Sequence, residues 1–60
     1  MVSDQMMLKS CVAHCQNTFN DIREMASTVA SSGAKDELNK ALGSIDACIK
    51  QCQAALTKLG

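Results

Sequence analysis

Four cysteines in two matching pairs constrain the fold of this chain more than any other feature. One CX3C motif is CVAHC, with Cys11 and Cys15, and the second is CIKQC, with Cys48 and Cys52. Cysteines four residues apart lie on one face of an α-helix, one turn apart. A reversal of the chain near residue 31 sets the first motif against the second, Cys11 opposite Cys52 and Cys15 opposite Cys48. The spacing therefore predicts an antiparallel helical hairpin with four thiols at one level.

Hydrophobic periodicity extends this hairpin over the whole chain. Apolar residues recur at heptad spacing on both sides of a break at residues 31–33, where Gly33 can take the left-handed conformation that ends a helix. The chain contains no Pro, the residue that kinks or breaks helices, so long helices are permitted. We predict an all-α fold and one domain over residues 1–60, with helices at about 3–31 and 35–59 and a turn at 31–34.

Three heptad positions, a, d and e, carry apolar side chains. In the predicted hairpin each a residue faces a d residue, as antiparallel coiled-coil packing requires. The e residues widen the apolar stripe beyond what one partner helix covers: Val12, Phe19, Leu42, Ile49 and Leu56. We expect this exposed e face to be the interface of a homodimer, a four-helix bundle of two hairpins, or the surface that binds another protein.

Composition excludes several classes of function. Six basic and six acidic residues give no net charge, and a single Phe is the only aromatic residue. The chain therefore has neither a basic patch nor a stacking platform for nucleic acid. No apolar run approaches the ~18 residues of a membrane span. The first ten residues lack the features of a secretory signal, so we expect a cytoplasmic location, where paired cysteines more often hold metal than form disulfides.

The cysteine spacing suits a metal site. Two thiol pairs on facing helices can place four sulfurs around one ion in a tetrahedron. Thiolates are soft ligands that suit Cu(I) and Zn(II), and the sequence does not choose between the two ions. We predict that the ligands are Cys11, Cys15, Cys48 and Cys52, with His14 as an additional candidate beside the first pair.

Two other uses of the cysteines remain open. Disulfides Cys11–Cys52 and Cys15–Cys48 would staple the hairpin into a protein-interaction module that holds no metal. Alternatively, the free thiols would pack as small apolar core residues. An enzyme is not expected, because a bare hairpin offers no pocket or oxyanion site for a nucleophilic cysteine.

The CX3C motifs resemble those of two groups of helical proteins. Helices with inward-facing CX3C cysteines are similar to those of the bacterial four-helix-bundle copper-storage proteins, whose core thiols hold Cu(I). This resemblance covers two short stretches, at Cys11 and Cys15 and at Cys48 and Cys52, and it implies Cu(I) binding. The twin motifs also resemble those of small mitochondrial intermembrane-space chaperones and plant hairpin peptides, which implies a helix–loop–helix with nested disulfides.

Overall fold

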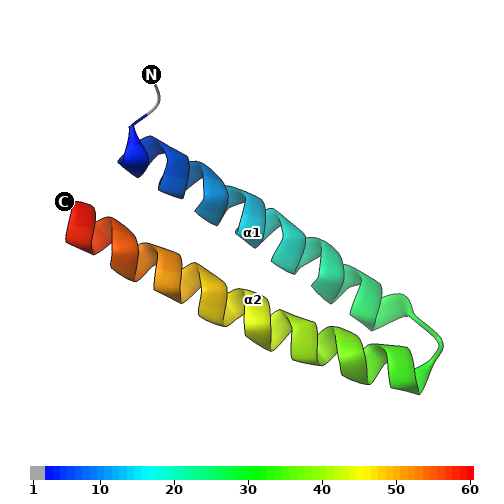
Figure 1. Ribbon diagram of the computed structural model, residues 1–60. Helices are drawn as coiled ribbons and strands as arrows, with labels where there is room; N and C mark the ends of the chain where they lie inside the picture. The colour runs from blue at the N-terminus through cyan, green and yellow to red at the C-terminus, as the bar shows by residue number, and fades with distance from the viewer. Residues whose placement is uncertain (1–2) are drawn as a thin grey trace.

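The computed structural model describes residues 3–60, which form two helices, α1 (Asp4–Thr28) and α2 (Ser32–Leu59). The helices lie side by side and run in opposite directions, with the connecting loop at one end of the molecule (Figure 1). The start of α1 and the end of α2 lie together at the other end, which we call the open end. The predicted all-helical hairpin is therefore confirmed.

Serine caps set the starts of both helices. Ser3 has an extended backbone, and its hydroxyl oxygen accepts a hydrogen bond from the N–H of Met6 at 3.2 Å. Ser31 caps α2 in the same way, accepting from the N–H of Ala34 at 3.2 Å. Each cap satisfies one of the backbone donors that the first turn of a helix leaves unpaired.

The loop lies earlier in the chain than the predicted turn at 31–34. α1 ends at Thr28 rather than at residue 31, and α2 begins at Ser32 rather than at residue 35. The prediction that Gly33 ends the first helix in the left-handed conformation is wrong, because Gly33 lies in the first turn of α2 and has no positive φ. Ser31 is a strong N-cap residue and starts α2 before Gly33 is reached, while extended Val29 closes α1.

Ser31→Ala is expected to lower the free energy of unfolding by about 1 kcal/mol, because the substitution leaves the Ala34 N–H without its cap. In a domain of this size, that loss lowers the melting temperature by about 4–8 °C. Thermal unfolding followed by far-UV circular dichroism measures the change. Ser32→Ala, one residue further on and already helical, is the matched control. Equal shifts in the two variants would contradict the assigned cap.

The interface between α1 and α2 consists of a and e positions rather than a and d positions. Along α1 the half-buried or buried side chains alternate at spacings of four and three: Leu8, Val12, Cys15, Phe19, Ile22 and Ala26. Half-buried side chains on α2 recur at the same spacing: Leu38, Leu42, Ile45, Ile49, Cys52 and Leu56. Most d residues are exposed: Asp4, Cys11, Thr18, Met25, Cys48 and Ala55. The e side chains are bulkier and more apolar than these d side chains, so burying them removes more apolar surface from water.

This register corrects the expectation of an exposed e face. Val12 is buried, and the other four residues of that predicted face are half-buried in the hairpin's own interface: Phe19, Leu42, Ile49 and Leu56. These residues therefore leave less apolar surface free for a second copy or another protein than the sequence predicted. The side of the stripe that remains exposed is the d side, which carries Cys11 and Cys48.

The hairpin encloses very little core. Among residues 3–60, only Val12 and Ala26 are buried, at 9% and 5% exposure. The accessible surface is 4481 Å², whereas the scaling of surface with mass gives about 3,800 Å² for a compact monomer of this size. Neither helix within residues 3–60 combines the length with the apolar content that a bilayer crossing requires.

Candidate functional site: a cluster of four thiols

All four cysteines lie on the open-end half of the hairpin, one CX3C pair on each helix. Cys15 and Cys52 occupy a positions and are half-buried between the helices. Cys11 and Cys48 occupy d positions and are exposed. All four thiols are free, so no disulfide joins the helices.

The two exposed thiols lie close enough to the half-buried pair to perturb its ionisation. Burial raises the pKa of Cys15, and the thiols of Cys48 and then Cys11 raise it further. Burial also raises the pKa of Cys52, followed by contributions from Cys48, Cys15 and Cys11. A thiolate is disfavoured both by a less polar surrounding and by a second thiolate nearby. Since Cys48 acts on Cys15 from the opposite helix, the hairpin brings the two CX3C pairs to one level.

Cys11 and Cys48 are expected to react several-fold faster with iodoacetamide than Cys15 and Cys52. The reactive species is the thiolate, and the half-buried pair combines lower access with raised pKa values. A short alkylation pulse followed by peptide mass spectrometry measures the four rates. The same pulse in denaturant is the control, in which all four cysteines should react alike. Equal rates in the folded protein would contradict the assigned exposures.

The stability of the reduced hairpin is expected to fall in alkaline solution. A thiol whose pKa is raised by folding holds its proton more tightly in the folded state, so its stabilising effect is complete below the ordinary value of 9.0. That effect is lost as the pH rises through 9.0 and then through the raised pKa values of Cys15 and Cys52. Urea unfolding at a series of pH values measures it, and the Cys15→Ser/Cys52→Ser variant should lack this part of the pH dependence.

The predicted ligands do not form an assembled metal site in a single chain. Among residues 3–60, no group of three or more His, Cys, Asp or Glu side chains is arranged to hold a metal ion. His14 is exposed at the neighbouring g position and joins no such group within the described residues. The hairpin thus collects four sulfurs at one level without converging them on one point.

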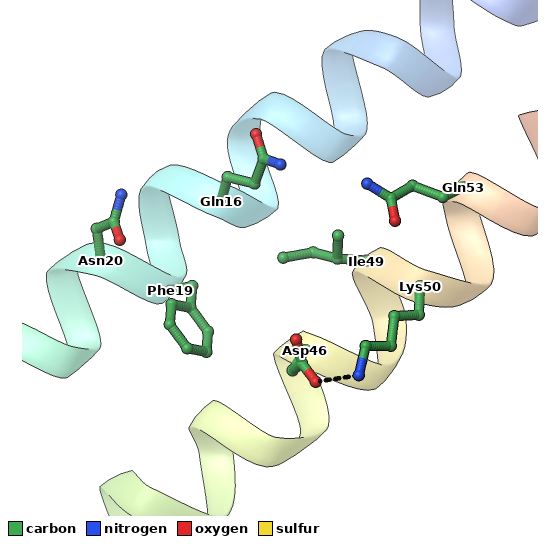
Figure 2. A pocket seen from close by; sticks show the side chains of 7 residues that line it. All are labelled: Gln16, Phe19, Asn20, Asp46, Ile49, Lys50 and Gln53. Carbon is green, nitrogen blue, oxygen red and sulfur yellow. Dashed lines mark ion pairs between the residues drawn. The ribbon is translucent and has the colours of Figure 1, made fainter.

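One side of the helix pair carries a polar groove of about 450 Å³ (Figure 2). Phe19 and Ile49 point into the space between the helices, and the Lys50 ammonium pairs with the Asp46 carboxylate at 3.0 Å. The other lining residues are polar: Gln16, Asn20 and Gln53. Sequence reasoning did not single out this groove, whose polar residues sit at b and f positions that ordinarily face water.

The other side, where the d positions lie, carries the exposed cysteines and has a largely apolar groove at the open end. A groove of about 600 Å³ at the open end is lined by Asp4, Met7, Leu8, Cys11, Ala55, Lys58 and Leu59. We call the exposed apolar and sulfur-bearing residues of this side the thiol face: Met7, Cys11, Met25, Cys48, Ala55 and Leu59. Sequence reasoning named its cysteines but missed the face, because it assigned the d positions to the interhelical interface.

Fold and cysteine cluster together define the molecule as a two-helix hairpin with one CX3C thiol pair on each helix. No protein-family model, no curated protein and no solved structure matches this chain. The four thiols are the residues whose chemistry bears most directly on function, because thiolate sulfur binds metal ions and forms disulfides.

Proposed function

We propose that this hairpin is a metal-binding protein that holds Cu(I) or Zn(II) through the thiolates of Cys11, Cys15, Cys48 and Cys52. The observation that supports the proposal is the gathering of the four cysteines at one level of the hairpin, with one CX3C pair on each helix. Cys48 on α2 raises the pKa of Cys15 on α1, so sulfurs from the two helices lie within short range of each other. Soft thiolates bind Cu(I) and Zn(II) in preference to harder ions such as Mg²⁺ and Ca²⁺.

Binding requires the cysteine side chains to reorient, since residues 3–60 hold no assembled group of three ligands. Exposed side chains change rotamer within picoseconds to nanoseconds, so Cys11 and Cys48 are able to turn as the metal arrives. Structural Zn(II) sites are almost always four-coordinate, so Zn(II) needs four converging ligands. The metal displaces thiol protons, and the raised pKa values of Cys15 and Cys52 make affinity increase with pH.

The proposal includes a homodimer in which two hairpins form a four-helix bundle. Two buried side chains among residues 3–60 do not make a hydrophobic core, and the accessible surface exceeds that of a compact monomer. A second hairpin would cover apolar surface that one hairpin leaves in water. The chain carries no net charge, so electrostatic repulsion does not oppose self-association.

An anaerobic titration of the reduced protein tests metal binding. Cu(I) and Zn(II) are added separately in the presence of a competing chelator, and native mass spectrometry gives the stoichiometry. The wild-type chain should retain metal, whereas the variant with all four cysteines changed to serine should not. His14→Asn should retain metal, since the thiols are the proposed ligands. Four free thiols with no retained metal would overturn the proposal.

A second candidate function is a disulfide-stapled interaction module, favoured by the closeness of Cys15 and Cys48 on opposite helices. Its bonds would be Cys15–Cys48 and Cys11–Cys52. Each bond delivers two electrons and two protons to an oxidant such as glutathione disulfide, which becomes two thiols. Intact mass under denaturing, non-reducing conditions distinguishes the candidates. A loss of four hydrogens supports the staple, and four free thiols contradict it.

A further inference from the structure

We infer that the metal site is shared between two copies of this chain, packed thiol face to thiol face with both loops at the same end. The inference rests on the proposed metal-binding function and adds where the ligands come from. Cys11 and Cys48 are exposed on the thiol face, and one chain assembles no group of three ligands within residues 3–60. A second copy brings its own Cys11 and Cys48 to the same level, so four exposed thiols from two chains join the half-buried Cys15 and Cys52 as available ligands for the four-coordinate site.

The chemistry of the thiol face favours burial. Met7, Met25 and Leu59 are 56%, 51% and 46% exposed, so a partner that covers them removes apolar surface from water. Cys48 and Ala55 are small, so two helices are able to approach closely there. The polar groove around Asp46 and Lys50 lies on the other side of the helix pair. Removing its polar and charged side chains from water would cost free energy. The thiol face is therefore the side that a partner covers.

A second copy fits the size of this face. The molecule measures 44 × 18 × 12 Å, so its broad face is about 800 Å² in projection. Stable interfaces bury about 800 Å² on each partner, so the occupant has to cover nearly the whole length of the rod. Another hairpin does so, and a two-fold axis then sets each face against the same residues of the other copy.

The position of the cysteines selects the orientation. They lie nearer to the open end than to the loop, so two hairpins with their loops at the same end bring the cysteine levels together at full overlap. When the loops lie at opposite ends, the cysteine levels align only if one hairpin is shifted lengthwise along the other. The shared length of α1 then falls from 25 residues to those numbered 4–22, which is about 28 Å instead of about 38 Å at a rise of about 1.5 Å per residue. The arrangement with loops at the same end buries more of the thiol face.

Three glutamate substitutions at exposed positions test this inference on the reduced chain with Cu(I). Ala55→Glu lies beside Cys11 in the open-end groove, and Met25→Glu lies on the thiol face toward the loop. Met6→Glu, at a residue that is 61% exposed outside the thiol face, is the control. Sedimentation equilibrium measures the dimer constant, competition with a chelator measures metal affinity, and far-UV circular dichroism checks the helices.

The wild-type chain and Met6→Glu should form metal-loaded dimers. Ala55→Glu and Met25→Glu should weaken the dimer about tenfold or more, with a parallel loss of metal affinity and unchanged helix content. If Ala55→Glu weakens the dimer and Met25→Glu does not, the loops lie at opposite ends and the inference is wrong. A metal-loaded wild-type monomer also overturns the inference, together with the proposed homodimer, but leaves the proposed metal binding by the thiols of one chain intact. A wild-type chain that takes up no metal refutes both.

Discussion

Saturation of the reduced hairpin with Cu(I) is expected to raise its melting temperature by about 15–30 °C. A ligand that binds only the folded state, at a free concentration about 1,000 times its Kd, stabilises a protein by about 4 kcal/mol. For a domain of about 60 residues, each kcal/mol shifts the melting temperature by about 4–8 °C. The expected effect is large because the two CX3C pairs meet only when the hairpin forms, so the proposed metal binding would be coupled to folding.

The control for this shift is the variant in which Cys11, Cys15, Cys48 and Cys52 are all serine. Its melting temperature should not respond to Cu(I), and the wild-type shift should shrink at lower pH because protons compete for the thiolates. Thermal unfolding by far-UV circular dichroism, with and without the metal, measures both effects. An equal rise in the serine variant would show that Cu(I) acts at a different place.

Val12→Asp is expected to unfold the hairpin. Val12 is 9% exposed in the interface between α1 and α2, so a carboxylate placed there would lose most of its contact with water. Burying an unpaired charge costs about 3 kcal/mol or more, and a chain of this length has a total stability of about 3–9 kcal/mol. Urea unfolding of the metal-free protein, followed by far-UV circular dichroism, should show a lost or strongly shifted transition.

Thr18→Asp is the matched control, because it adds the same charge on the same helix. Thr18 is exposed at a d position, and its hydroxyl only donates to the His14 carbonyl at 2.9 Å. The metal-free Thr18→Asp variant should therefore remain folded. The opposite ranking, with Thr18→Asp unfolded and Val12→Asp stable, would restore an interface of a and d residues.

The hairpin and its cysteine level follow from the sequence, whereas the register of the interface does not. Heptads that are apolar at a, d and e contain two possible stripes, and periodicity alone does not choose between them. Side-chain volume decides: Phe19 and Ile49 at e positions bury more surface than Thr18 and Cys48 at d positions. Comparing the volumes of the d and e residues would have predicted the observed register.

The loop shows a similar competition between signals. Ser31 and Gly33 lie two residues apart, and each is a common helix boundary residue. A glycine that ends a helix requires a left-handed backbone, but the Ser31 side chain already caps α2 through the Ala34 N–H. The ligand arrangement around the cysteines is a different case. In the proposed site this arrangement would depend on side-chain rotamers and on a second copy, and spacing along one chain contains neither.

The cysteines sit far from the covalent link between the helices. Two helices that are joined by a loop at one end separate first at the open end, because no covalent link holds them together there. A bond across the cysteine level encloses at least the 32 residues between Cys15 and Cys48, and closing a longer segment removes more freedom from the unfolded chain. A metal ion or a disulfide at this level would therefore hold the two helices together near the open end. Its loss would leave the helices connected covalently only by the loop.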